Sequence, residues 1–381
     1  MTIPGQHDLP LGRLEGWMRG HIDGFRGPLA AEQFAGGQSD PTYKLHSGTG
    51  SYVLRRKPLG QLLPSAHAVD REYRVMRALA ETAVPVPRVY ALCEDDAVIG
   101  SAFYLMEFLD GRIFWDPRLP GLAPAERRAM FQSMNTVIAA LHSVDQVAVG
   151  LAEFGRPGNY LARQIARWSR QYQASETEPQ PAMDRLIEWL PRHLPPEGEP
   201  RIVHGDYRID NLIFHPTEPR VIGVLDLELS TTGDPLADFA YHAMAWRVTP
   251  ELFRGLAGVD LAALGIPSED EYVAAYGERT GRGRSPDWEF YMVYSLFRLA
   301  AIMQGIAKRA LDGTAASPDA VDLGRKARPT GEQAWALARS LGASPPARSS
   351  LRAGRNRIGA LAQRQKYPIC QIVSAKVRTL Y

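Results

Sequence analysis

The hydrophobic pattern divides the chain into an N-terminal part with short strands and a longer part dominated by helices. Between residues 34 and 55, short extended runs alternate with glycine turns, which is typical of strands joined by tight turns. Residues 69–79 place apolar side chains at helical spacing, and residues 102–109 form an apolar run typical of a buried strand. We expect a helix within residues 1–33 to pack against this part.

From Pro124 onward the spacing of apolar residues is mainly helical. Pro124 itself suits the first turn of a helix, where a missing N–H does no harm. Ser268 and Glu271 have the spacing of a capping box, which predicts a helix start. The helices predicted in this part are 124–141, 159–172, 183–190, 236–246, 268–279 and a long one from Ser285 toward Lys308.

Two short β-type runs, 212–214 and 221–225, flank a turn-forming segment and predict a hairpin. Asn211 precedes the first run and Asp226 follows the second. A hairpin of this length brings these two residues together at one end of the strand pair. Asp206, on the loop just before, is expected to face the same small volume.

Two carboxylates and one amide oxygen at one place suit a hard cation such as Mg²⁺. They are also the groups that phosphoryl transfer requires, because that reaction depends on positioning and charge neutralisation. In this interpretation Asp206 accepts the proton of an attacking hydroxyl, and Asn211 and Asp226 hold the metal. Arg208 could reach the transferred phosphoryl group. The alternative is that Asp206 and Asn211 only cap a turn, but the combined spacing of all three residues favours chemistry.

The motifs HGDYRIDN (204–211), VLDLE (224–228) and GDPLADF (233–239) resemble those of the aminoglycoside phosphotransferase and choline kinase branch of the protein-kinase-like fold. The resemblance is strongest to the phosphotransferase-like domains that occur alone in bacteria or joined to acyl-CoA dehydrogenases, and it extends from about residue 34 to about residue 341. Leu-Glu follows Asp226 where protein kinases have Phe-Gly, which puts activation-loop switching of the protein-kinase type in doubt.

This resemblance implies an α+β fold of two lobes, a small β-rich N-lobe and a larger, mainly helical C-lobe. Residues 1–109 would form the nucleotide-binding lobe, 110–342 the catalytic and acceptor-binding lobe, and 343–381 a basic tail. The cofactors implied are ATP and Mg²⁺. The residues implied to contact or support the nucleotide are Gly36, Gly37, Gln38, Ser39, Arg55, Glu72, Glu107 and Leu109.

The phosphate-binding assignment rests on different signals at different positions. Adjacent glycines let a backbone approach a phosphate closely. Taken alone, residues 36–39 are better explained by a plain hairpin turn, and it is their position before the catalytic stretch of the resembled fold that favours phosphate binding. Arg55 ends the third strand where protein kinases have a Lys, but Arg56 and Lys57 follow directly, so the cation that points inward stays open. The resemblance pairs Glu72 with that strand cation. It also implies that backbone groups from Glu107 to Leu109 bind the adenine edge.

Several other residues allow two interpretations from the sequence. Trp115, Trp168 and Tyr172 either line an acceptor pocket or pack in the core. Glu228 either shapes the site or lies on the surface, and His142 is expected to be an ordinary histidine at a helix end. Asp234 is predicted to cap a helix, and together with Asp238 it is predicted to support the catalytic loop.

Composition narrows the classes of function. The chain has 381 residues, 45% of them apolar, and a net charge of +2, so charge gives no reason to expect a nucleic-acid partner. Two cysteines far apart in sequence suggest no disulfide framework, which favours a reducing cytoplasm. No secretory signal is visible, and the apolar run 290–307 is interrupted by Arg298 and Gln304, so we expect no membrane span. Oligomeric state stays open.

The expected activity is transfer of the ATP γ-phosphoryl group to a hydroxyl of a small-molecule acceptor. The resembled branch uses amino sugars, choline-like alcohols and homoserine, and the dehydrogenase-linked domains make a hydroxy acid or hydroxyacyl-CoA attractive. The alternative is a pseudokinase that binds nucleotide without turnover, although the presence of Asp206 argues against it. After Glu332 the chain has no acidic residue. This basic tail is a solvated segment, a contact for an anionic partner, or the product of a shifted reading frame.

Overall fold

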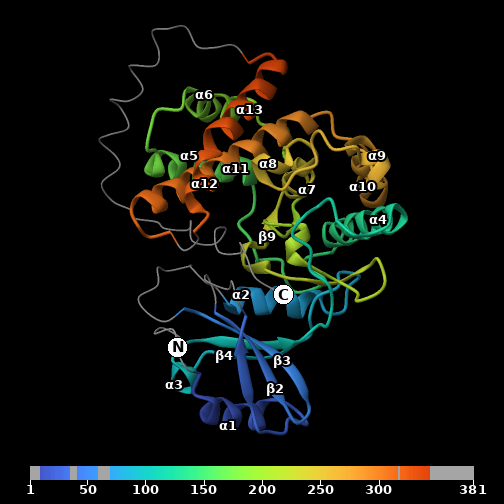
Figure 1. The fold of residues 1–381 in the computed structure, drawn as a ribbon, viewed down its shortest axis with the longest axis vertical. Helices are drawn as coiled ribbons and strands as arrows, with labels where there is room; N and C mark the ends of the chain where they lie inside the picture. The colour runs from blue at the N-terminus through green and yellow to red at the C-terminus, as the bar shows by residue number, and fades with distance from the viewer. Residues whose placement is uncertain (1–8, 35–40, 59–68, 316–317, 344–381) are drawn as a thin grey trace.

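A computed structural model describes residues 9–34, 41–58, 69–315 and 318–343. Figure 1 shows two lobes stacked along the long axis of the molecule, a small one with the sheet and a larger one with most of the helices. The two-lobed α+β architecture expected from the sequence is therefore present. The predicted phosphate turn at 36–39 and the basic tail beyond 343 lie outside the described residues.

The small lobe is built on a five-stranded antiparallel sheet with the order β1-β2-β3-β5-β4. Alternation along β3 sends Leu54 to one face of the sheet and Val53 to the other. Leu54 packs with helix α1 in one apolar cluster, whereas Val53 packs with helix α2 in the main core. The elements are α1 Leu11–His21, β1 Ala30–Gln33, β2 Thr42–Ser47, β3 Gly50–Arg56, α2 Val69–Leu79, β4 Val89–Cys93, α3 Asp96–Ile99 and β5 Phe103–Glu107.

Strand β1 was not predicted, because residues 1–33 were expected to contribute only a helix. The predicted helix is present as α1, but residues 30–33 also form an edge strand that pairs with β2. All four of its residues are exposed, so no apolar alternation marks the segment. Its conformation comes from the hydrogen bonds of the neighbouring strand, which local sequence does not reveal.

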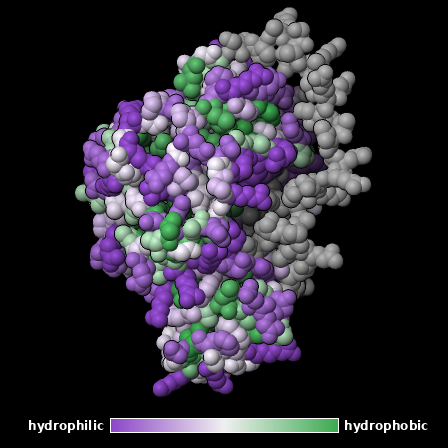
Figure 2. Space-filling model, turned by 180° about the vertical axis from the view of Figure 1, so that it is seen from behind, coloured by the Kyte–Doolittle hydropathy of each residue, from purple (hydrophilic) through white to green (hydrophobic). Residues whose placement is uncertain are grey.

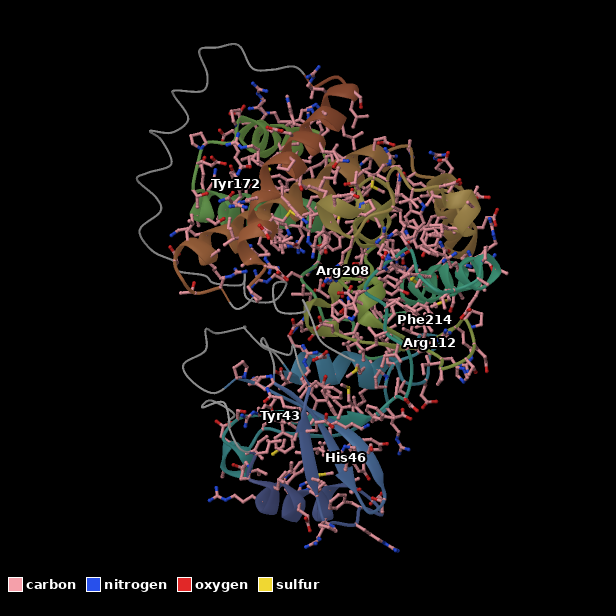
Figure 3. The ribbon with its side chains drawn as sticks, in the orientation of Figure 1. Tyr43, His46, Arg112, Tyr172, Arg208 and Phe214 are labelled. Carbon is pink, nitrogen blue, oxygen red and sulfur yellow. The ribbon has the colours of Figure 1, made fainter. Side chains whose placement is uncertain are left out.

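The connection from the small lobe crosses the hairpin of residues 212–224 at Gly111. A Cβ atom at this position would lie 2.4 Å from both the Ile213 side chain and the Phe214 carbonyl oxygen, so only glycine fits. The next residue, Arg112, exchanges two backbone hydrogen bonds of 2.8 Å with Phe214. Figure 3 shows these two residues side by side below the larger lobe.

Helix α11 is the centre of the large lobe. It packs against α5, α7, α12 and α13, and it begins at Trp288, three residues after the predicted start. It is the one helix of the described residues that is long and apolar enough to cross a membrane, yet 94% of that window is buried inside the protein. It is therefore a core helix, as its two polar interruptions suggested.

The predicted helices are present in the predicted order, although α7 ends earlier than expected and continues as the 3-10 turn η4. Helices α8, α9, α12 and α13 were not predicted. Ser268 and Glu271 form the predicted capping box. The elements are α4 Pro124–Leu141, α5 Tyr160–Ser175, α6 Pro181–Trp189, η1 Leu190–Arg192, α7 Pro235–Ala243, η4 Met244–Trp246, α8 Pro250–Phe253, α9 Leu261–Leu264, α10 Glu269–Thr280, α11 Trp288–Leu311, α12 Ala320–Arg325 and α13 Ala327–Ser340.

Two small antiparallel pairs carry the motif residues between the lobes. Strand β6, Arg201–Val203, pairs with β9, Thr231–Gly233, and strand β7, Leu212–Phe214, pairs with β8, Val221–Val224. The turns η2, Ile209–Asn211, and η3, Leu227–Leu229, begin or end beside these strands. Hydrophilic residues cover most of the face seen in Figure 2, with apolar residues in scattered groups.

Candidate active site

The β7–β8 hairpin brings Asn211 and Asp226 to the same end of the strand pair. Leu212 lies opposite Val224, and the Leu225 N–H donates to the Asn211 carbonyl oxygen over 2.8 Å. Asp226 follows directly with a left-handed backbone, φ 66°, which turns the chain away from the strand into η3. The hairpin predicted from the spacing of the two residues is thus confirmed.

Asp206 lies on the loop that leads into this hairpin. The Asn211 side-chain amide donates to the Asp206 carbonyl oxygen at 2.8 Å and approaches its carboxylate at 3.3 Å. The nearest guanidinium nitrogen of Arg208 is 3.9 Å from the carboxylate. Burial raises the pKa of Asp206, and the positive charges of Arg208 and Arg298 oppose this rise.

Arg55 reaches from β3 into a cluster of three acidic side chains, which we call the Arg55 cluster: Arg55, Glu72, Asp226 and Glu228. Its guanidinium lies 3.1 Å from Glu72, 2.9 Å from Asp226 and 3.0 Å from Glu228. Burial alone would lower the pKa of Arg55, but the three carboxylates hold it well above its ordinary value. Glu72 also accepts from the Leu227 N–H at 3.2 Å, so helix α2 is tied directly to the segment after Asp226.

The structure distinguishes the three consecutive cations that the sequence left open. Arg56 is buried on the other face of the sheet, where it donates to the Ile99 carbonyl oxygen and faces the Tyr43 ring. Lys57 lies 3.6 Å from Asp70. Among the three, Arg55 is therefore the one that contacts the residues after β8.

Asp238 organises the backbone of the loop that contains Asp206. Its carboxylate accepts from the N–H groups of His204 at 2.7 Å and Gly205 at 2.8 Å. It also accepts from His142 Nε2 at 3.1 Å, and the other ring nitrogen of His142 contacts the Tyr276 hydroxyl at 2.7 Å. Burial by itself would raise the pKa of Asp238, but the hydrogen bond and charge of His142 hold it below the ordinary value.

These contacts confirm Asp238 as a support of the loop and correct the expectation for His142. His142 was interpreted as an ordinary histidine at a helix end, yet it is fully buried and joined to a residue 96 positions away. Asp234 caps α7, as predicted, by accepting from the N–H groups of Leu236 and Ala237. It also accepts from the Tyr291 hydroxyl at 2.8 Å.

Arg298, on α11, holds the other side of the same loop. It donates to the Gly205 carbonyl oxygen, and its guanidinium faces the Tyr241 ring at 3.9 Å and the Trp168 ring at 5.2 Å. His204 contributes a further link, because its Nε2 donates to the Leu225 carbonyl oxygen at 2.9 Å while its Nδ1 accepts from the Asp206 N–H. The loop is thus fixed from three directions.

A pocket opens beside Arg208. Trp115 lines it, whereas Trp168 packs beneath Arg298 in the core. Tyr172 is fully buried, and Figure 3 shows it among the helices far from Arg208. From the sequence, each of these three aromatic residues could line an acceptor pocket or pack in the core. Trp115 is the one that lines this pocket.

The predicted hinge residues lie at the junction of the lobes. The Glu107 N–H donates to the Arg88 carbonyl oxygen at 2.8 Å, and the Glu107 carboxylate accepts from the Arg88 N–H at 3.2 Å. Leu109 packs on the hairpin, since a Cβ at Gly223 would lie 2.5 Å from the Leu109 side chain. Gly36, Gly37, Gln38 and Ser39 lie outside the described residues.

The groups at the end of the hairpin fit Mg²⁺ by their chemistry. Within the described ranges, no group of three or more His, Cys, Asp or Glu residues is arranged to hold a metal ion. Asn211 and Asp226 instead offer an amide oxygen and a carboxylate, both hard donors of the kind that Mg²⁺ combines with phosphate oxygens. The amide nitrogen of Asn211 donates to the Asp206 carbonyl, so its oxygen is the atom of this side chain whose chemistry suits a cation.

Comparisons with known proteins identify the family of the chain and relate its fold to solved structures. The family model described as the phosphotransferase enzyme family matches residues 30–294. Acyl-CoA dehydrogenase family member 10 of Mus musculus is 47% identical over 333 residues, which cover 87% of this chain and 31% of that protein. The chain spans less than half the length of the curated relatives it matches.

Two solved structures share the fold. A Ralstonia eutropha protein, solved as a candidate aminoglycoside phosphotransferase, is 56% identical with a TM-score of 0.81, covering 87% of this chain and 99% of that one. The phosphotransferase APH(4)-Ia, solved with ADP and hygromycin B, is 18% identical with a TM-score of 0.55, covering 88% of this chain and 99% of that one. This likeness supports the kinase-like, two-lobed fold. On the match over residues 30–294, the chain belongs to the phosphotransferase enzyme family.

Proposed function

We propose that this chain catalyses Mg²⁺-dependent transfer of the ATP γ-phosphoryl group to a hydroxyl of a small molecule. The observation that supports this most is the arrangement at the end of the β7–β8 hairpin. Asp206 and Asn211 are hydrogen-bonded to each other, and Asp226 is tied to Arg55 of the small lobe. These contacts support a site in which one carboxylate would serve the acceptor, two oxygen donors would hold a metal and one cation would bind phosphate.

Each residue has a proposed role in this reaction. Asp206 accepts the proton of the acceptor hydroxyl, and Arg208 stabilises the charge of the transferred group. Asn211 and Asp226 would hold Mg²⁺, which supplies neutralisation of phosphate charge when bound. Arg55, together with residues 36–39, grips the nucleotide phosphates. The complex of APH(4)-Ia with ADP supports the use of a nucleotide by this fold.

For the acceptor, we propose a hydroxy acid or a hydroxyacyl-CoA over an amino sugar. The relation to an acyl-CoA dehydrogenase family member supports an acyl compound. The pocket beside Arg208 adds a physical reason, because it has two arginines, Arg208 and Arg254, for one carboxylate, Asp210. An amino sugar is a polycation and would favour an acidic pocket.

The direct experiment measures Mg²⁺-dependent ADP release by the wild-type chain and by Asp206→Asn, with Asp322→Asn at an exposed position as the matched control. Removing a general base reduces turnover by about 10²–10⁴-fold, and the control is expected to match the wild type. Equal rates in the wild type and Asp206→Asn would instead indicate a nucleotide-binding pseudokinase.

A second measurement tests the acceptor class. The same assay is run with amino sugars, choline-like alcohols, free hydroxy acids and hydroxyacyl-CoA thioesters. We expect the acyl compounds to stimulate ADP release most. No stimulation by any hydroxyacyl-CoA would reject that part of the proposal.

A further inference from the structure

The pocket beside Arg208 has a strongly uneven lining. Charged groups occupy one end, and aromatic and aliphatic side chains form the rest of the wall. The lining residues come from residues 115–117, helix α4, the loop after Asp206, helix α7 with η4, and the segment around α8. The apolar lining residues include Trp115, Phe131, Met134, Ala245, Trp246 and Phe253. Most of this wall cannot hydrogen-bond a sugar.

The charged end of the pocket lies next to the proposed base. Arg208 lines the pocket and is also 3.9 Å from the Asp206 carboxylate. Asp210 bridges the two arginines, since it accepts from Arg208 Nε at 3.0 Å and from Arg254 Nη1 at 3.2 Å. A ligand in the pocket therefore has one end near Asp206 and the remainder against apolar walls.

Tyr241 has a hydroxyl group that makes no hydrogen bond within the described part of the chain. The residue is 1% exposed, lines the pocket, and its hydroxyl has no hydrogen-bond partner among the described residues. Burial raises its pKa, and the charges that act on it include Asp206, Arg208 and Asp210. A buried hydroxyl without a partner is costly, and an oxygen of a bound molecule would remove that cost.

We propose that this pocket is the acceptor subsite, that its apolar wall binds an uncharged aliphatic segment of the acceptor, and that the Tyr241 hydroxyl binds an acceptor oxygen. Tyr241 and Ala245 are then specificity-determining residues, for hydrogen bonding and for chain length respectively. This inference rests on the proposed function, because it supposes that the hydroxyl next to the aliphatic segment is the group presented to Asp206.

The first test changes the length of the apolar space. Ala245 is part of the wall and only partly buried, so Ala245→Leu adds volume there without deleting a polar contact. The probes are butanediol, hexanediol and octanediol, which differ only in aliphatic length, and the readout is acceptor-stimulated ADP release. We expect kcat/KM for octanediol relative to butanediol to fall about tenfold or more. Ala262→Leu, at an exposed position of α9, is the control and should keep the wild-type ratio.

The second test removes a single atom. Tyr241→Phe keeps the ring against Arg298 but deletes the hydroxyl. We expect a rise of about tenfold in KM for the diols without a comparable rise in KM for ATP. An unchanged KM for every diol, or an unchanged length preference in Ala245→Leu, would overturn the inference.

Binding measured without turnover separates the subsite from the reaction. Trp115 and Trp246 line the pocket, so their fluorescence reports its occupancy. Length-dependent quenching by the diols, lost in Ala245→Leu, together with no ADP release, would leave the subsite standing and reject the proposed function. ADP release stimulated by acceptors, with no effect of any diol on fluorescence, would reject the subsite and leave the reaction standing.

Discussion

Two arginines near the candidate site, the partly buried Arg55 and the buried Arg298, are stabilised in opposite ways. Arg55 lies among three carboxylates contributed by helix α2 and the segment after β8. Arg298 makes no ion pair with a carboxylate in the part of the chain that the structure describes; its neighbours are a carbonyl oxygen and two aromatic rings. The Arg55 side chain is only 12% exposed and Arg298 is buried, so solvent exposure does not explain the difference.

The difference indicates two kinds of task. The Arg55 cluster has three carboxylates for one arginine, and it links the two lobes. Because its charges are not balanced, a bound cation or phosphate would be expected to rearrange it. Arg298 is fixed by packing and holds the Gly205 carbonyl, so its task is to keep the loop before Asp206 in place. The first arrangement can respond to a ligand, and the second provides a rigid support. The predictions below test this distinction, from the largest expected effect to the smallest.

Arg55→Met should be the most damaging change. It leaves Glu72, Asp226 and Glu228 close together without their cation, and removing one partner of a buried ion pair costs about 3–5 kcal/mol. The measurement is the free energy of unfolding from urea titration, with Arg56→Met as a matched change on the opposite face of β3. Equal destabilisation by both variants would show that the cluster is no more than ordinary packing.

Asp226→Ala should abolish stabilisation by Mg²⁺ and ATP. A ligand at a hundred times its Kd stabilises a protein by about 2.7 kcal/mol, and the loss of a metal ligand should remove most of this. The measurement is thermal unfolding with and without Mg-ATP, and with a chelator to remove the metal from the wild type. A full shift retained in the variant would eliminate Asp226 as a metal ligand.

Arg298→Met should cost about 1–3 kcal/mol of stability, because the Gly205 carbonyl loses its donor inside the protein. Since the loop carries Asp206, kcat should fall more than KM for ATP changes. Arg298→Lys, which keeps a donor, should restore part of kcat. A variant with lower stability and unchanged kcat would mean that Arg298 supports the fold alone.

His242 should make stability depend on pH. Burial lowers its pKa to about 4, although Asp238 opposes the shift, whereas in the unfolded chain a histidine titrates near about 6.5. The unfolded state therefore takes up a proton first as pH falls. The stabilisation is complete above about pH 6.5 and is lost as the pH approaches about 4, with about 1 kcal/mol gone by about pH 5.5.

The measurement is urea unfolding at several pH values for the wild type and for His242→Gln. The variant should lose stability less steeply on acidification. His46→Gln, at an exposed position of β2, is the control and should follow the wild type. Parallel curves for wild type and His242→Gln would contradict the prediction.

Local sequence was sufficient where the geometry depends on a few neighbouring residues. The spacing of β7 and β8 predicted that Asn211 and Asp226 meet, and the capping box predicted the start of α10. Alternation along β3 also placed Arg55 and Arg56 on opposite faces, but which of them faces the large lobe depends on the packing of α2. Local patterns contain no information on that choice.

Long-range contacts account for what the sequence did not reveal. His142 has the pattern of a helix-end residue, and only the fold brings it to Asp238. Arg298 looked like an interruption of an apolar helix, whereas it is the residue of α11 that reaches the loop before Asp206. Trp115 and Trp168 are both aromatic residues with apolar neighbours, and their different locations follow from the way distant helices meet.

The glycine at which the interlobe connection crosses β7 has a consequence for motion. Gly111 packs closely against the hairpin, and Arg112 is hydrogen-bonded to Phe214. The part of the connection from Gly111 onward is therefore held against the hairpin. An opening of the two lobes would therefore have to be taken up by residues upstream of Gly111. The end of the hairpin that carries Asn211 and Asp226 would then keep its position relative to Arg112, while Arg55 would move with the sheet.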